Sequence, residues 1–295
     1  MDTVLITGIS GFLGWNLARR LKSSYRVYGT YLDHAVDMDR CETLAFDLTN
    51  LSQIERLCST IRPKAIVHAA ALRDPDRCET ERRLALTLNT FATRELARSC
   101  SLLESKLIYL SSDLLFDGVK GMYTEAEDPV PMSYYAKTKH LGELEVTNNC
   151  GNYVILRLSL TYGRGGGDTE STFEAMERQV TQGKKLNLFT DQYRTPLFVD
   201  DAVVAIERII SGKNTKGLFH LGGPERMSRH EFGQQFCQIF HYPASMLIPS
   251  RMADSRLPAF RPRDCSLDSR KAVKVLNLQT TSVLRGLQAL SRQGP

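Results

Sequence analysis

Three glycines at a fixed spacing, Gly8, Gly11 and Gly14, constrain the fold of this chain because of what flanks them. An apolar run at residues 3–7 precedes them, and a segment with helical periodicity, residues 12–21, follows. Glycines between a strand and a helix allow a tight turn and a close approach of backbone to phosphate, and the helix N-terminus supplies free amide donors. The first interval is one residue longer than in Gly-x-Gly-x-x-Gly, and a purely structural turn is the alternative. The position of the motif favours a dinucleotide site.

The pattern of apolar residues predicts an α/β fold. β-rich runs at residues 4–7, 26–31, 64–69 and 106–110 alternate with helical segments at 12–21, 51–61 and 81–103. Such alternation indicates a Rossmann-type, doubly wound parallel sheet with helices on both faces. After a further strand at 153–159, helices at 172–183, 199–212 and 229–241 mix with short strands. We expect a dinucleotide-binding domain at 1–160 and a smaller C-terminal α/β substrate-binding region at 161–295, with some segments returning to the first domain.

Composition excludes several other classes of protein. The apolar fraction of 42% and the charged fraction of 24% are ordinary for a water-soluble chain, and no apolar run approaches the roughly 18 residues of a membrane span. The N-terminus has no basic segment typical of a secretory signal. The seven cysteines are scattered and odd in number, which favours reduced thiols over a disulfide framework or zinc site. We expect a cytoplasmic protein, without membrane contact, and no metal site.

Positive charge is concentrated in the C-terminal half. The net charge is +5, and residues 251–274 contain Arg251, Arg256, Arg261, Arg263, Arg270, Lys271 and Lys274. No aromatic-interleaved patch or recognition motif accompanies them, so we expect no nucleic-acid partner. An anionic small molecule such as a diphosphate fits better, and a solvated basic surface is the alternative.

Tyr135 and Lys139 lie four residues apart in a segment expected to be helical, and therefore on one helix face. A neighbouring ammonium favours the phenolate, so we expect Lys139 to lower the pKa of Tyr135 and make it a proton donor. Taken alone, this spacing recurs by chance. Ser112 follows the strand at 106–110, at the sheet edge where ligands bind, and its hydroxyl is suited to bind a substrate carbonyl oxygen.

Residues at other strand ends predict further cofactor contacts. The second strand ends at Thr30 and Tyr31, without the carboxylate that favours NAD, although Asp33 lies just beyond. Arg19 and Arg20 are candidates for a 2′-phosphate, so the choice between NAD and NADP stays open. Asp47 and Leu48 follow the third strand, where an adenine would lie, and the small residues after the fourth strand allow close approach of a cofactor: Ala69, Ala70 and Ala71.

In this order, these residues resemble the extended short-chain dehydrogenase/reductase superfamily over nearly the whole chain. A more specific stretch runs from Ser111-Ser112-Asp113 through Phe116-Asp117-Gly118 to Tyr135-x-Lys137-Thr138-Lys139. It is similar to the dTDP-4-dehydrorhamnose reductase family and equally to the offshoot of that family, the regulatory β subunit of methionine adenosyltransferase. The resemblance implies further cofactor contacts from Ser10, Phe12, Leu13 and Asn89, and substrate contacts from Ser111, Asp113, Arg194 and Arg263.

The resemblance also implies a reaction, NAD(P)H-dependent reduction of the C4 ketone of a nucleotide-linked deoxysugar. Tyr135 would protonate the developing alkoxide, Lys139 would hold the nicotinamide ribose, and Ser112 would orient the carbonyl. Leu114 departs from the tyrosine common in the reductases, and the charged loop Arg73-Asp74-Pro75-Asp76-Arg77-Cys78-Glu79 resembles the regulatory subunit equally. A non-catalytic regulatory subunit, and a reductase or epimerase for another nucleotide sugar, therefore remain alternatives. A homodimer is one assembly left open.

Overall fold

A seven-stranded parallel sheet forms the centre of the molecule in the computed structural model, which describes residues 1–167, 169–212 and 214–293. The strand order is β11-β6-β5-β4-β1-β2-β3, and each neighbouring pair is parallel. The chain leaves the sheet in opposite directions from β1 and β4, so the order reverses between these two strands. Open α/β sheets bind ligands at such a reversal, beyond the carboxyl ends of the strands. The α/β fold class expected from the sequence is confirmed.

The sheet is built from β1 (Thr3–Thr7), β2 (Arg26–Tyr31), β3 (Cys41–Ala45), β4 (Ala65–His68), β5 (Lys106–Ser112), β6 (Tyr153–Leu158) and β11 (Gly217–Leu221). The shorter strands are β7 (Thr161–Tyr162), β8 (Leu186–Phe189), β9 (Tyr193–Arg194), β10 (Leu197–Phe198), β12 (Met227–Ser228) and β13 (Leu247–Ser250). The α-helices are α1 (Phe12–Leu21), α2 (Ile54–Ile61), α3 (Pro75–Thr80), α4 (Arg82–Leu86), α5 (Ala92–Leu102), α6 (Tyr134–Asn149), α7 (Thr172–Thr181), α8 (Val199–Ser211), α9 (Arg229–Ile239), α10 (Arg270–Val275) and α11 (Val283–Ser291).

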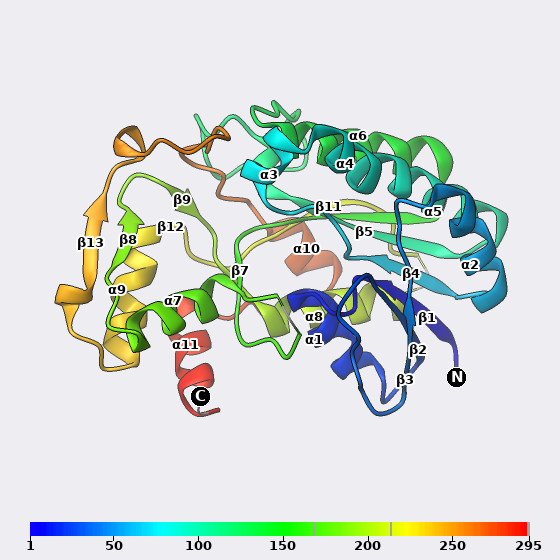
Figure 1. Ribbon diagram of the computed structural model, residues 1–295, viewed down its shortest axis with the longest axis horizontal. Helices are drawn as coiled ribbons and strands as arrows, with labels where there is room; N and C mark the ends of the chain where they lie inside the picture. The colour runs from blue at the N-terminus through cyan, green and yellow to red at the C-terminus, as the bar shows by residue number, and fades with distance from the viewer. Residues whose placement is uncertain (168, 213, 294–295) are drawn as a thin grey trace.

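Helices cover both faces of the sheet (Figure 1). Helices α1 and α8 pack together below it in this view, and α2, α5 and α6 pack above it. Strands β4 and β5 are buried along their whole length, which explains their nearly continuous apolar and small residues. Parallel strands need crossover connections, and here α1 lies between β1 and β2, α2 between β3 and β4, α5 between β4 and β5, and α6 between β5 and β6. The carboxyl ends of β1, β4 and β5 therefore meet along one edge.

The C-terminal part of the chain divides between the sheet and a smaller region. β11 pairs with β6, and α8 packs on α1, so both belong to the large sheet. The smaller region, at the left of Figure 1, contains the parallel pair β8–β13, the antiparallel pair β9–β12 and helices α7, α9 and α11. Helix α9 packs against β8 and α11. This region faces the carboxyl edge of the sheet.

Two segments differ from the sequence-based expectation. The charged segment after β4 is not a loop throughout, because α3 forms at Pro75–Thr80. Asp74 accepts hydrogen bonds from the main-chain N–H groups of Asp76 and Arg77, and Pro75 occupies the first helical position, so a cap and a proline begin the helix. The helix expected at 81–103 is divided into α4 and α5 by a π-helical turn at Thr87–Phe91.

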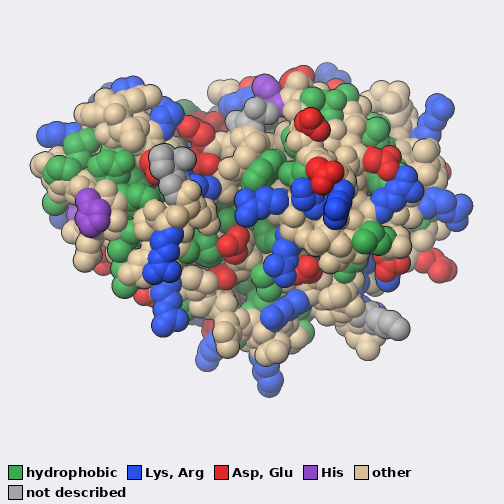
Figure 2. All heavy atoms as spheres, turned by 90° about the horizontal axis from the view of Figure 1, so that it is seen from below, with side chains coloured by type: hydrophobic (Ala, Val, Ile, Leu, Met, Phe, Trp, Pro, Cys, Tyr) green, Lys and Arg blue, Asp and Glu red, His purple; other side chains and the backbone are tan. Residues whose placement is uncertain are grey.

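Charged side chains on the face shown in Figure 2 are mixed in sign. Lys and Arg side chains there alternate with Asp and Glu, and they form no continuous basic patch on that face. No helix in the described ranges is long and apolar enough to cross a membrane.

Candidate active site

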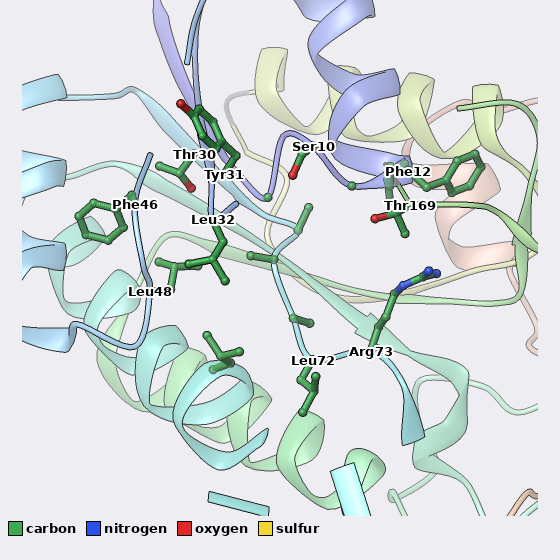
Figure 3. Close-up of a pocket in the computed structure, with 18 of the residues that line it drawn as sticks. Ser10, Phe12, Thr30, Tyr31, Leu32, Phe46, Leu48, Leu72, Arg73 and Thr169 are labelled. Atoms are coloured by element: carbon green, nitrogen blue, oxygen red, sulfur yellow. The ribbon is translucent and has the colours of Figure 1, made fainter. Parts of the chain in front are cut away.

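The glycine loop after β1 forms one wall of a cleft of about 580 Å³ at the reversal of strand order. The other walls come from the ends of β2, β3 and β4, and Figure 3 shows Ser10, Tyr31, Leu48 and Arg73 around the cleft. The predicted cofactor residues that line it are Gly8, Ser10, Gly11, Phe12, Leu13, Gly14, Tyr31, Asp47, Leu48, Ala69, Ala70 and Ala71. The topology brings these residues together although more than sixty positions separate the first from the last.

The start of α1 offers donors to an anion. Gly11 occupies the N-cap position, and no side chain caps the helix. The first-turn N–H groups of a helix need partners, and with no side chain in that role they suit the oxygens of a pyrophosphate. Gly14 is required for the close fit of this turn, because a Cβ at that position would lie 2.1 Å from the carbonyl oxygen of Gly8. The residues present therefore fit a dinucleotide.

Tyr31, Phe46 and Leu48 form one end of the cleft (Figure 3), and Asp47 also lines the cleft. No carboxylate from the tip of β2 lines the cleft, and Asp33 is exposed beyond it. Neither arginine considered for a 2′-phosphate lines the cleft. Arg19 lies over the ring of Trp15, and Arg20 pairs with Glu207 at 2.8 Å.

Asn89 lies behind the cleft. Its side chain accepts from the N–H of Leu72 at 2.9 Å and donates to the carbonyl oxygen of Leu72 at 3.1 Å. It also donates to the hydroxyl of Thr138 at 3.0 Å. Asn89 therefore fixes the chain after β4, and attaches it to α6, without lining the cleft itself.

Tyr135 sits in the first turn of α6 and lines a second cleft, of about 450 Å³. The hydroxyl of Ser133 caps this helix by accepting from the N–H of Ala136, and the carboxylate of Glu79 accepts from the N–H of Tyr134 at 2.7 Å. Arg73 lines both clefts, so the two meet at this side chain. Tyr135 thus lies where a substrate would meet the end of a bound dinucleotide.

The protonation of Tyr135 differs from the expectation. Burial raises the pKa of Tyr135 to about 12, and the Ser112 hydroxyl opposes this only in part. The cation whose charge lowers this pKa is Arg73, not Lys139. The prediction that Lys139 lowers the pKa of Tyr135 is therefore wrong in this structure, because removal of the phenol from water outweighs nearby positive charge. Tyr135 is held as a neutral phenol, which is the form that donates a proton.

Lys139 and Ser112 are buried behind Tyr135. The ammonium of Lys139 donates to the carbonyl oxygen of Leu110 at 2.7 Å, and burial lowers its pKa to about 7. Ser112 ends β5, where its hydroxyl accepts from the N–H of Leu114 at 3.1 Å and donates to a carboxylate oxygen of Asp113 at 3.3 Å. Ser111 is also buried but lines neither cleft. The structure thus brings the three expected catalytic side chains into one place at the edge of β5.

The second cleft is rich in arginine. Arg194 lines it, is buried, and pairs with the buried carboxylate of Asp113 at 3.4 Å. Arg263 is exposed and outside the lining, whereas Arg261, two residues earlier, lines the cleft. Arg229 also lines it and was missed from the sequence. Its position depends on pairing of distant strands, which no local pattern reveals.

Among the described residues, no group of three or more His, Cys, Asp or Glu is placed to hold a metal ion.

Fold and site together define a Rossmann-type α/β protein with a cleft that fits a dinucleotide and with the Ser/Tyr/Lys arrangement of a short-chain dehydrogenase/reductase. The chain belongs to the RmlD substrate binding domain family, whose model matches residues 1–293.

Similar proteins are named either as reductases or as regulatory subunits of methionine adenosyltransferase. The probable low-salt glycan biosynthesis reductase Agl14 of Haloferax volcanii is 31% identical over 269 residues, covering 89% of this chain and 88% of its own length. The methionine adenosyltransferase 2 subunit beta of Xenopus laevis is 33% identical over 278 residues, covering 92% and 81%. The crystal structure of dTDP-4-dehydrorhamnose reductase from Bacillus anthracis in complex with NADP matches with a TM-score of 0.88 and 27% identity over 99% of both chains.

Proposed function

We propose that this protein reduces the C4 ketone of a nucleotide-linked deoxysugar with NADPH or NADH. The observation that carries the proposal is the position of Tyr135, which faces the arginine-lined cleft at its junction with the dinucleotide cleft. The similarity to a glycan biosynthesis reductase and to a dTDP-4-dehydrorhamnose reductase that binds NADP supports the same chemistry.

Each side chain has a role in this reaction. A bound nicotinamide cofactor supplies the hydride that reduces the carbonyl carbon. The Ser112 hydroxyl binds the carbonyl oxygen, which requires its proton to turn from Asp113 toward the substrate. Tyr135 gives its proton to the same oxygen as negative charge develops, and water then restores the phenol. Arg73, whose charge lowers the pKa of Tyr135, stabilises the transient phenolate, and Lys139, as an ammonium, would hold the nicotinamide ribose. The product is a secondary alcohol at the former ketone.

To test the proposal, the purified protein is incubated with dTDP-4-dehydro-6-deoxy-L-mannose and NADPH or NADH. Oxidation of the cofactor is measured as a fall in the absorbance of the reduced nicotinamide. Tyr135→Phe should lower turnover about 10²–10⁴-fold, the usual contribution of a general acid, and leave NADPH affinity unchanged. Tyr134→Phe is the matched control, because Tyr134 precedes Tyr135 and packs under Arg82. Full activity of Tyr135→Phe would contradict the mechanism.

A regulatory subunit is the second candidate, favoured by the 33% identity to a methionine adenosyltransferase β subunit. A bound dinucleotide would then be a structural ligand. Tight NADPH binding without oxidation across several 4-keto sugar nucleotides would support this candidate. Co-elution with a methionine adenosyltransferase catalytic subunit, and a change in the activity of that enzyme, would establish it.

A further inference from the structure

Two arginines are brought to the wall of the substrate cleft by one short strand pair. β9 and β12 are antiparallel, with Arg194 opposite Met227, and the N–H of Arg229 extends the ladder by donating to the carbonyl oxygen of Gln192 at 3.0 Å. Opposite residues in an antiparallel pair point to one face, and diagonal neighbours lie about 7–8 Å apart. Arg194 and Arg229 are therefore neighbours on the face that lines the cleft with Tyr135.

The guanidinium of Arg194 is committed to the protein. It pairs with Asp113 at 3.4 Å, donates to the carbonyl oxygen of Tyr193 at 2.6 Å, and reaches that of Pro262 at 3.4 Å. These contacts hold the guanidinium of Arg194 against the wall of the cleft. Arg194 consequently shapes the cleft and holds the segment around Pro262, but has few donors left for a ligand.

The guanidinium of Arg229 has no such partners. In the parts of the chain that the structure describes, no hydrogen bond or ion pair involves it, although the side chain is partly buried. Burial and the neighbouring charge of Arg194 lower the pKa of Arg229 to about 10, and the carboxylate of Asp113 opposes this only in part. Asp113 is already paired with Arg194, so the positive charge of Arg229 has no ion-pair partner among the described residues.

The other arginines of the cleft are accounted for elsewhere. Arg261 pairs with Asp76 at 2.9 Å. Arg73 lies at the junction with the dinucleotide cleft and points toward Phe12 and Thr169, on the cofactor side (Figure 3). Arg229 belongs to α9 in the smaller region, and so stands on the substrate side.

We propose that Arg229 binds the diphosphate group of the nucleotide-sugar substrate. The inference rests on the proposed function, and it assigns to this side chain the recognition of the substrate's anionic part. A guanidinium fork matches two oxygens of a phosphate, and such charge-assisted pairs are stronger and more selective than a lysine contact. A diphosphate also supplies the negative charge that the cleft lacks.

The test measures the binding of dTDP and UDP by calorimetry, without turnover. Arg229→Gln should weaken both about 10–100-fold, as expected for lost hydrogen bonds to a charged group, and should reduce the salt dependence of binding. Arg229→Lys should be intermediate, because it keeps the charge but loses the fork. Thymidine and uridine should bind all variants alike. Arg56→Gln, on the exposed side of α2, is the matched control, and the melting temperature of each variant reports folding.

Unchanged affinity of Arg229→Gln for dTDP and UDP would overturn the inference, as would a wild-type protein that binds neither. A carboxylate on the sugar is the other source of negative charge. If Arg229→Gln lost affinity for UDP-glucuronic acid but bound UDP and UDP-glucose as the wild type does, Arg229 would bind the sugar carboxylate. That result would also overturn the proposal. Binding of dTDP that depends on Arg229, without ketone reduction, would sustain the inference while the proposed reaction fails.

Discussion

The ammonium nitrogen of Lys139 lies 4.0 Å from the centre of the Tyr109 ring. Tyr109 is a buried residue of β5, so strand and helix hold the cation between an aromatic face and the carbonyl oxygen of Leu110. A desolvated cation–π contact stabilises the charge by about 2 kcal/mol. Burial nevertheless lowers the pKa of Lys139 to about 7, because these contacts replace water incompletely.

This pKa predicts the pH dependence of the proposed reduction. Lys139 is charged below about pH 7 and loses its proton above it, so kcat/KM, which reports the free enzyme, should fall as the pH rises through that value. Lys139→Arg should remove this limb, because a guanidinium stays charged. Lys137→Met, two residues away and exposed on the same helix, should keep the wild-type profile. A wild-type profile that is flat to pH 9 would contradict the assignment.

Gly14→Ala should damage the cofactor cleft. The added Cβ would lie 2.1 Å from the carbonyl oxygen of Gly8, so the loop or α1 must move. Overpacking of this kind costs about 1–3 kcal/mol of stability, and we expect at least a tenfold loss of NADPH affinity. Gly151→Ala is the control, because a Cβ there meets nothing within 4 Å. Fluorescence titration with NADPH and urea unfolding measure both effects; equal behaviour of the two variants would refute the role given to Gly14.

A buried ion pair beneath the site should contribute to acid stability. Arg157 binds Glu143 through two hydrogen bonds, of 2.9 and 2.7 Å, with both side chains buried. Although burial alone would raise the pKa of Glu143, Arg157 holds it at about 2, below the usual 4.5. The pair therefore stabilises the fold above about pH 4.5, and this contribution is lost as the pH falls toward 2.

Glu143→Gln tests this pair. It should cost about 3–5 kcal/mol at neutral pH, because it leaves the Arg157 charge buried and unpaired, and the pH dependence of unfolding between 4.5 and 2 should become shallower. Glu55→Gln, exposed on α2, should change little. Urea unfolding at neutral pH and between pH 4.5 and 2 measures both effects. If Glu143→Gln lowered the free energy of unfolding at neutral pH by less than about 1 kcal/mol, the pair would be dispensable for stability.

The sequence predicted the parts of the molecule that depend on local pattern. The ends of α1 follow from the glycine motif and the helical periodicity, and β4 and β5 follow from their unbroken apolar runs. Parallel strands gather their carboxyl ends at one edge, so the meeting of Ser112 with the glycine loop could be expected from strand order.

Other features depend on contacts between distant residues. Arg229 reaches the cleft because β12 pairs with β9, and the register of two-residue strands is set by the surrounding packing. Arg261, not Arg263, faces the cleft, because residues 255–262 form no helix or strand and therefore have no period to extrapolate. The raised pKa of Tyr135 depends on how deeply the phenol is buried, which spacing along a helix does not report.

Asp76 joins the two sides of the substrate cleft. One carboxylate oxygen pairs with Arg261 at 2.9 Å, and the other accepts from the N–H of Ala259 at 2.9 Å. Helix α3, after β4, is thereby tied to the C-terminal segment that lines the cleft. Asp76→Asn keeps an acceptor for Ala259 but removes the charge that fixes Arg261.

Partly exposed pairs of this kind contribute up to about 1 kcal/mol. Asp76→Asn should therefore raise the KM of the sugar nucleotide about 3–5-fold and leave kcat and NADPH affinity unchanged, because the tie holds the cleft wall without touching the reacting atoms. Asp254→Asn, an exposed carboxylate in the same C-terminal segment, is the matched control. Steady-state kinetics with both substrates varied provide the measurement. A fall in kcat at constant KM would place Asp76 in the chemical step and contradict its role as a tie.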